Sequence, residues 1–450
     1  MLEGTAISII GKAQKGVVYI FLDYIHEIED IYLENVDNHE ILNIDIDMLL
    51  PERDTSIPHR IEIRDTERPN DRTNERPTSL LPGTKWQLWI NRLKTNTFTI
   101  LGTEPPLCIY NSCCGYKSHR LENGTMDIDD KTLRRMCKEE YDVMVHMGDQ
   151  IYADTIFEEW EYSPLCDKQN SSLWISKYRQ CYRDVFGSIA FKKIFSKGIH
   201  IMIADDHDQK FYNDKHEMHG VITRTNIAVA SRITMFEYQK QLWFDNVELT
   251  AIQNGTLSPN LTLRFRDMNL VVMDTRYSNI YHHDPENPFM SEPQMKYLDH
   301  ELNRDEKNIV VTSVPILANT KIGSWFKNKV DVMETDDSTY CNNINNALKV
   351  LEMLSDHDGQ SANILVSGDL HHASKTDLYK DGQFVCRQYI TSGLTDGSVA
   401  SKSNGRLFRL FSCCFDMYRL NGFIGRNIET NFRKNYLIME RCGRFRFVLD

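Results

Sequence analysis

Three short apolar runs along the chain each stop at a polar turn that contains aspartate. Runs of this length that end in a turn are typical of buried strands. Open α/β sheets place ligands beyond the carboxyl ends of their strands, so we expect the three turns to converge at a sheet edge. A single Gly-Asp after a strand is more often a turn or a helix cap, and only the repetition favours a shared site. The runs and their turns are Val143–Met147 with Gly148-Asp149, Ile201–Ala204 with Asp205-Asp206-His207-Asp208, and Ile364–Ser367 with Gly368-Asp369-Leu370-His371-His372.

The first part of the chain, residues 1–105, has the composition of a β-rich domain. Strands are predicted at Val17–Tyr24, Ile41–Leu49, Gln87–Leu93 and Thr97–Leu101. Residues 51–83 are polar and hold five prolines, at positions 51, 58, 69, 77 and 82, so a long loop or an edge excursion, too charged to pack, is expected there. A small β-sandwich-like domain packed on the rest of the chain fits this pattern.

Residues 106–450 alternate apolar strand patterns with helical ones, which predicts a layered α/β or α+β core. An aromatic stripe of Trp174, Tyr178, Tyr182 and Phe186 recurs every four residues and indicates core packing by spacing alone. Helices are expected at Asp129–Tyr141, Ser172–Phe186, Asn226–Phe244, Glu292–Leu302 and Asn343–Ser355, and further strands at Leu107–Tyr110, Leu261–Phe265, Leu270–Met273, Ile309–Val314, Gln383–Ile390, Tyr436–Glu440 and Arg444–Leu449.

Composition narrows the function. The chain has 450 residues and a formal net charge of −12, which disfavours a strong, sequence-independent grip on nucleic acid. No run approaches the roughly 20 apolar residues of a membrane span, and the N-terminus lacks the pattern of a secretory signal. The 11 cysteines are an odd count without zinc-like pairing, so reduced thiols and a cytoplasmic location are expected.

The polar turns carry the ligand types of a metal centre. Carboxylates and imidazoles together suit transition metals and calcium-like ions. Two metals roughly 3.5–4 Å apart can share one carboxylate, and Asp149 is the candidate for that bridge. Asp369 and His371 are two residues apart and can point to the same side, whereas His372 then points away or supports the site from behind.

Six stretches in order resemble the PhoD-like alkaline phosphatases of the calcineurin-like metallophosphoesterase superfamily. The resemblance implies a four-layer α/β/β/α catalytic core, preceded by the β-rich domain. The stretches are Ser112-Cys113, His146–Tyr152, Tyr178-Arg179, Asp205–Asp208, Asp274–Arg276 and Ser367–His371.

The same resemblance implies a ligand set. Cys113 falls where this family uses a cysteine, and Tyr178, with Tyr182 as the second choice, resembles its ferric-iron ligand. Asp206 stands where the superfamily has an asparagine ligand, and Asp369 and His371 resemble the last ligand pair. The expected cofactors are Fe(III) plus Ca or another divalent metal.

The superfamily usually opens with an Asp-x-His metal motif, which is not found here, and PhoD-like enzymes are similar in lacking it. Three departures from the family pattern bear on the metal set and on substrate access. One is that no obvious C-terminal lid is found in the sequence. His207-Asp208 replaces the family's His-Glu, and Thr312–Pro315 stands where the superfamily has a histidine motif.

The implied activity is hydrolysis of small phosphate mono- or diesters, with metal-bound hydroxide attacking phosphorus. His207 would contact the phosphate or protonate the leaving group. Arg179 and Arg276 are candidates to clamp phosphate oxygens, but each could equally form a structural ion pair, and this alternative is favoured for Arg276. Tyr152 could stack on a substrate or simply pack. One competing interpretation is a nuclease or nucleotide phosphodiesterase, for which the acidic balance disfavours a long polyanion but leaves a small nucleotide open. The other is a catalytically silent scaffold or binding protein, which the complete ligand set disfavours.

Overall fold

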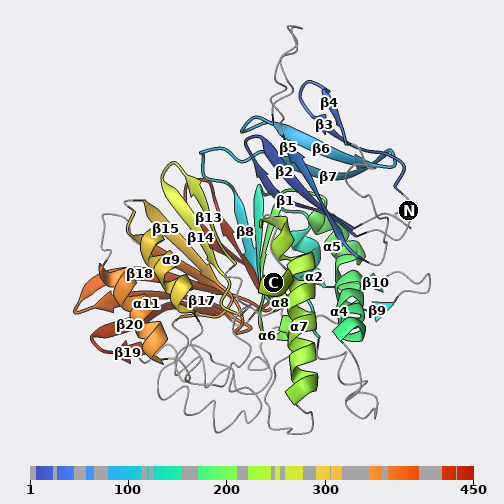
Figure 1. Cartoon of the computed structure of the whole chain (residues 1–450). Coiled ribbons are helices and arrows are strands. Elements are labelled where there is room, and N and C mark those ends of the chain that lie inside the picture. Colours follow the sequence, from blue (N-terminus) through green and yellow to red (C-terminus); the bar gives the residue numbers. More distant parts are fainter. Residues whose placement is uncertain are drawn as a thin grey trace.

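The computed structural model of the chain shows a mixed α/β protein with several sheets (Figure 1). The described residues are 7–23, 28–44, 57–64, 80–112, 119–120, 126–128, 130–153, 171–209, 221–244, 249–253, 259–276, 290–304, 306–316, 344–356, 363–394, 418–431 and 433–450.

The N-terminal part forms two sheets, coloured blue in Figure 1. A three-stranded sheet has the order β1-β2-β5, and a four-stranded sheet has the order β4-β3-β6-β7. The strands are β1 (Ile7–Gln14), β2 (Val17–Asp23), β3 (Ile31–Asn35), β4 (Ile41–Asn43), β5 (His59–Arg64), β6 (Lys85–Ile90) and β7 (Leu93–Thr99).

One prediction for this part is wrong in part. The polar stretch 51–83 was expected to be a long loop or an edge excursion too charged to pack, yet it contains β5, an edge strand that pairs antiparallel with β2. Its sequence alternates, and Ile61 is buried while the flanking charged residues are more exposed. The prolines on either side of this strand obscured a period of two.

A five-stranded sheet carries the first two aspartate turns. Its order is β12-β11-β8-β21-β22, and β8, β11 and β12 are mutually parallel. Their carboxyl ends therefore lie at one edge, as the sequence predicted. The strands are β8 (Cys108–Asn111), β11 (Val143–Met147), β12 (Ile199–Ile203), β21 (Asn435–Met439) and β22 (Phe445–Leu449).

An eight-stranded sheet carries the third turn. Its order is β13-β14-β15-β16-β18-β17-β20-β19, with β14, β15, β16 and β18 parallel to their neighbours in that run. The strands are β13 (Asn260–Phe265), β14 (Met268–Met273), β15 (Lys307–Thr312), β16 (Asn363–Ser367), β17 (Ala373–Lys380), β18 (Gln383–Thr391), β19 (Tyr418–Leu420) and β20 (Phe423–Asn431). A separate two-stranded sheet pairs β9 (His119–Arg120) with β10 (Met126–Asp127).

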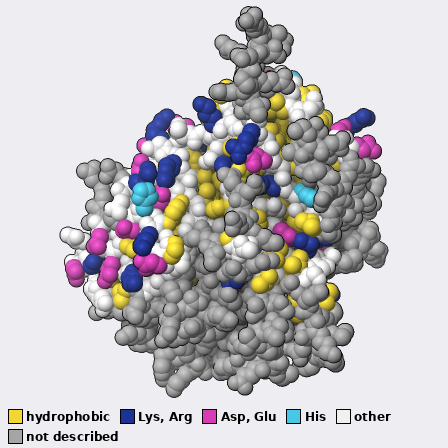
Figure 2. Space-filling view, in the orientation of Figure 1, with side chains coloured by type: hydrophobic (Ala, Val, Ile, Leu, Met, Phe, Trp, Pro, Cys, Tyr) yellow, Lys and Arg dark blue, Asp and Glu magenta, His cyan; other side chains and the backbone are white. Residues whose placement is uncertain are grey.

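Two apolar cores hold these layers together. The larger is one cluster that runs from the N-terminal sheets through the five-stranded sheet and its helices to the inner face of the eight-stranded sheet. The second lies between the eight-stranded sheet and two helices, α9 (Glu292–Leu302) and α11 (Ile344–Asp356). Over the region of these two helices, charged side chains of both signs are interspersed on the outer surface (Figure 2), as expected for amphipathic helices.

The remaining helices are α2 (Lys131–Met136), α4 (Ser171–Phe186), α5 (Ile189–Phe195), α6 (Asp206–Gln209), α7 (Val221–Tyr238), α8 (Leu249–Gln253) and the 3-10 turn η2 (Lys240–Leu242). Two predicted helices are shorter than expected. The first begins after Asp130, which caps it, and it ends at Met136. The helix predicted to reach Phe244 ends at Tyr238, and the turn that follows lets Lys240 contact Asp274. No helix in the described part of the chain is long and apolar enough to cross a membrane.

Candidate metal centre

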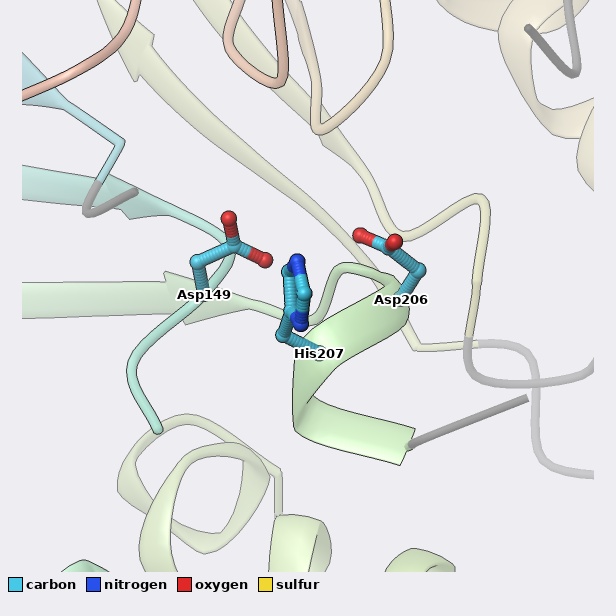
Figure 3. A group of neighbouring side chains, drawn as sticks. All are labelled: Asp149, Asp206 and His207. Atoms are coloured by element: carbon cyan, nitrogen blue, oxygen red, sulfur yellow. The ribbon is translucent and has the colours of Figure 1, made fainter. Parts of the chain in front are cut away.

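The three aspartate turns meet. Asp149, Asp206 and His207 each offer a ligand atom within 4.8 Å of the others. Asp205, Asp206 and Asp369 form a second, overlapping group with the same spacing. Figure 3 shows the imidazole of His207 between the carboxylates of Asp149 and Asp206. Donor atoms from both large sheets thus lie around Asp206, which belongs to both groups.

Glycines allow this close approach. Gly148 has φ = 103°, and a Cβ on it would lie 2.3 Å from the Cβ of Asp205. The turn after β11 can therefore touch the turn after β12 only with glycine at that position. Gly368 does the same between the sheets, because a Cβ there would lie 2.5 Å from the Cβ of Ser112. Asp149 and Asp369 themselves have φ of 57° and 69°, in the left-handed region, which Asp adopts more readily than most residues.

The buried carboxylate of Asp208 holds two of the turns together. Its Oδ2 accepts hydrogen bonds from the backbone N–H groups of Asp149 and Asp205, each at 2.9 Å. Its Oδ1 accepts from the N–H of Ile151 at 3.3 Å and from Nε2 of Gln239 at 3.2 Å. Burial raises the pKa of Asp208 to about 7, against the lowering effect of these backbone donors. Asp208 thus fixes the positions of the turns after β11 and β12 through these hydrogen bonds.

Tyr152 positions two of the candidate residues. Its hydroxyl donates to Oδ2 of Asp149 at 3.2 Å. Its ring stacks on the imidazole of His207 with centroids 4.0 Å apart. One side chain therefore fixes both the carboxylate and the plane of the imidazole. The structure places Tyr152 against the cluster, but its predicted contact with substrate stays a prediction.

Arg276 is buried against Asp205. Its Nε donates to Oδ1 of Asp205 at 2.7 Å, and both side chains are at most 1% exposed. Its backbone N–H donates to Asp274, whose other oxygen accepts from the N–H of Ala204 and pairs with Lys240. This geometry favours the structural ion pair that the sequence left open for Arg276.

The other predicted residues lie as follows. Arg179 on α4 forms a bidentate pair with Glu237 on α7, with N–O distances of 2.8 and 2.5 Å. Tyr178, next to it, is fully buried. Tyr182, the second choice for the iron ligand, accepts a hydrogen bond from Nε2 of Gln239 at 2.8 Å.

His371 is partly buried in the turn after β16, with φ = 52°. Cys113 lies outside the described residues.

Sequence reasoning missed the parts played by Asp205, Asp208 and Gln239. Asp205 belongs to the second donor group, and its place directly after an apolar strand was the available signal. Asp208 was noted only as a departure from the family pattern. Gln239 bridges Asp208 and Tyr182 from the end of a helix, and nothing in its local sequence marks it.

The donor set fits a bound cation. Four carboxylates, from Asp149, Asp205, Asp206 and Asp369, lie in two overlapping groups, and Asp149 and both members of the Asp205-Asp206 pair are nearly inaccessible to solvent. Buried like charges this close repel one another, and Arg276 pairs with one of them, Asp205. Carboxylate oxygens with an imidazole nitrogen are ligands for hard and borderline metal ions. A bound metal ion would add positive charge among these carboxylates.

Solved structures share this fold. The structure of PhoD is 12% identical, with a TM-score of 0.61, and the match covers 96% of this chain and 83% of that one. The purple acid phosphatase PPD1 from yellow lupin (Lupinus luteus) seeds is 9% identical, with a TM-score of 0.52, and the match covers 97% of this chain and 70% of that one. No curated protein matches the sequence.

The fold and the family comparison together define a phosphatase. The chain belongs to the PhoD-like phosphatase family, whose model matches residues 108–410. It is therefore a phosphatase, and its chemistry is the hydrolysis of phosphoesters. The resemblance of the six short motifs is confirmed by this match, which spans all six in one continuous segment.

Proposed function

We propose that the chain hydrolyses small phosphate esters at a metal centre formed by Asp149, Asp206 and Asp369 with His371, Cys113 and Tyr178. The observation that supports this most is the convergence of Asp149, Asp206 and His207 within 4.8 Å from turns far apart in the sequence. Asp206 belongs to both donor groups, so it is an alternative to Asp149 as the shared ligand. The structure also suggests Asp205 as a further donor.

Fe(III) with Ca or another divalent metal is the proposed pair. The thiolate of Cys113 and the phenolate of Tyr178 would favour the ferric ion, and the carboxylates suit the harder divalent one. Such ions, when bound, lower the pKa of water and polarise phosphoryl oxygens. Full burial of Tyr178 fits a phenol that serves a ligand role inside the protein.

The remaining roles, proton transfer and phosphate binding, are proposed for side chains of the protein. His207 is proposed to hold a proton for the leaving-group oxygen, and stacking on Tyr152 keeps its ring in one plane beside Asp149. Arg179 would clamp non-bridging oxygens. Its pair with Glu237 leaves the guanidinium partly exposed, at 16% of the side chain, so it can reach a ligand only by sharing or leaving that partner.

A four-layer α/β/β/α core over residues 106–450, with the N-terminal β-rich domain ending near residue 105, is the proposed architecture. Support comes from the two large sheets and from their helices, which pack in two separate apolar clusters. The larger cluster also includes the N-terminal sheets, so the two domains are proposed to fold as one unit.

The test is turnover with generic chromogenic esters. Purified protein is treated with a chelator and reconstituted with Fe(III), Ca²⁺ or other divalent ions, singly and in pairs. Hydrolysis of p-nitrophenyl phosphate and bis-p-nitrophenyl phosphate is then compared. We expect activity only after metals are restored, and the ratio of the two rates assigns monoester or diester preference. Full activity in the chelated protein would contradict the metal-dependent mechanism.

A further inference from the structure

A cavity lies away from the aspartate turns. It has a volume of about 510 Å³, within the range of small-molecule sites. Lys307 and Asn363, the first residues of β15 and β16, lie on its wall, and the tip of the β21–β22 hairpin closes another side. Its full lining is Lys307, Asn363, Ile364, Lys375, Phe384, Arg387, Tyr389, Gly443, Arg444 and Phe445. We call it the distal pocket.

The distal pocket and the aspartate turns lie at opposite ends of β16. That strand begins at Asn363 in the pocket wall, and Asp369 follows its other end. At about 3.3 Å per residue, the two positions are roughly 20 Å apart. A ligand held at the end of the pocket formed by Lys307 and Asn363 therefore lies apart from the candidate metal centre.

Positive charge gathers around this cavity in a chain whose formal net charge is −12. Its lining includes four cationic side chains, Lys307, Lys375, Arg387 and Arg444. Arg387 forms a bidentate pair with Asp377, with N–O distances of 2.5 and 2.9 Å. Within the described part of the chain, the other three form no ion pair.

Two acidic groups lie near these cations. Asp377 is neutralised by Arg387, and Glu429 is exposed on β20 opposite Lys375 in the strand register. The described lining of the cavity itself holds four cationic side chains and no carboxylate, so the cavity wall is positive. Burial and the charge of Arg387 lower the pKa of Lys307, because both disfavour its protonated form. A bound anion would stabilise that protonated form.

Aromatic rings supply the remaining walls. Phe384, Tyr389 and Phe445 line the cavity, and Tyr389 stacks on Phe445 with centroids 4.8 Å apart. Phe384 is held edge-on by Tyr379 at 5.7 Å. Rigid rings beside unpaired lysines match a ligand with one flat, apolar part and one anionic part. A bare phosphate ion would leave most of the volume and the rings unused.

We propose that the distal pocket binds a nucleotide-like ligand, a small phosphate ester that carries a flat aromatic base. The phosphate lies against Lys307, Lys375 and Arg444, and the base packs on the aromatic wall that includes Phe384. The amide of Asn363, buried at the amino end of β16, provides polar groups at the floor. This binding does not depend on the proposed metal centre, and it needs no turnover.

The test is calorimetric titration of the full chain with the methylene phosphonate analogue of AMP, which phosphatases do not hydrolyse. The variant Lys307→Gln/Lys375→Gln removes two pocket charges. Lys296→Gln/Lys349→Gln is the matched control, because it makes the same charge change on the exposed faces of α9 and α11. Activity on p-nitrophenyl phosphate in every variant reports whether the fold and the candidate metal centre are intact.

We expect the pocket variant to bind the analogue at least about tenfold more weakly, since charge-assisted hydrogen bonds are lost, while its activity and the control variant's affinity stay unchanged. Phe384→Leu should weaken the analogue about fivefold or more and leave inorganic phosphate binding unaltered. Equal affinity in the wild type and the Lys307→Gln/Lys375→Gln variant would overturn the site. Equal effects of Phe384→Leu on analogue and inorganic phosphate would overturn the nucleotide assignment.

Discussion

The carboxylate of Asp208 accepts a hydrogen bond from the backbone N–H of Asp149 at 2.9 Å, so the turn after β11 is held by a residue on α6. The same oxygen accepts from the N–H of Asp205 at 2.9 Å. One buried carboxylate therefore sets the distance between two donor turns that are more than 50 residues apart in the chain. Supporting contacts of this kind orient metal ligands.

Asp208→Asn should loosen the donor turns. In the wild type, backbone N–H groups donate to both carboxylate oxygens, and in the variant an amide nitrogen, itself a donor, would replace one of these oxygens. We expect kcat and metal affinity to fall by about 10–100-fold. The free energy of unfolding should fall by about 1–3 kcal/mol. Steady-state kinetics and urea titration measure both. Asp267→Asn, at an exposed turn between β13 and β14, is the control and should change neither. Wild-type kinetics in Asp208→Asn would show that the clamp is dispensable.

Gly148→Ala tests the contact between the two turns. The added Cβ meets Asp205 at 2.3 Å, and the positive φ adds backbone strain. Gly83→Ala is the matched control, because Gly83 also has a positive φ, of 85°, but nothing lies within 4 Å of its Cβ position. The control should lose about 1–2 kcal/mol of unfolding free energy from strain alone, and Gly148→Ala about 1–3 kcal/mol more. Gly148→Ala should also lose activity. Equal losses in the two variants would mean that the clash is relieved without cost.

Arg276→Met should destabilise the fold strongly, because the buried carboxylate of Asp205 loses its ion pair with the guanidinium of Arg276. The expected loss in unfolding free energy is about 3–5 kcal/mol. Arg92→Met removes an exposed pair with Asp30, in which the arginine side chain is 89% exposed, and should cost at most about 1 kcal/mol. Unfolding by urea distinguishes the two. If Arg276→Met instead keeps its stability and raises only KM, the predicted phosphate clamp is correct.

The buried pair of His146 and His200 predicts a pH dependence of stability. Nε2 of His146 lies 3.1 Å from Nδ1 of His200, and Nε2 of His200 donates to the carbonyl of Lys197 at 3.0 Å. Burial lowers the pKa of His200 to about 3, and burial with the charge of His200 lowers that of His146 well below its usual value. Both are neutral in the fold, whereas the unfolded chain binds protons below about 6.5.

The free energy of unfolding should therefore fall as the pH falls from about 6.5 towards 3, by up to about 1.4 kcal/mol per pH unit for each histidine. Urea titrations between pH 4 and 7, with chelator present so that metal loss does not contribute, measure this slope. His200→Gln should reduce it, and His300→Gln, exposed on α9, should leave it unchanged. An unaltered slope in His200→Gln would show that this pair does not titrate on unfolding.

Much of the fold follows from local pattern. β11, β12 and β16 are uniformly buried, so their apolar runs are visible without any partner. Strands such as β17 were missed. Ala373–Lys380 mixes polar and apolar residues, and it is a strand because it pairs with β18 on one side and β20 on the other. Pairing of this kind is decided by distant segments, which no local window contains.

In the candidate site, too, some residues follow from local sequence and some contacts depend on distant segments. Asp149, Asp206 and Asp369 could be predicted because each follows an apolar run, and parallel strands bring such ends to one edge. The partners of Arg179 and Arg276 in their ion pairs could not be predicted, since Glu237 and Asp205 are 58 and 71 residues away in sequence. The distal pocket was also invisible to sequence reasoning, because its lysines come from β15 and β17 and meet only through the order of the sheet.

The most direct measurement is the metal content of Asp149→Asn beside that of the wild type and of Asp267→Asn, by elemental analysis of protein purified in parallel. If Asp149 is a shared ligand of the centre, the variant should lose at least one metal per chain and nearly all hydrolysis of p-nitrophenyl phosphate, while Asp267→Asn keeps both. Wild-type metal content together with wild-type turnover in Asp149→Asn would contradict a metal centre at these turns.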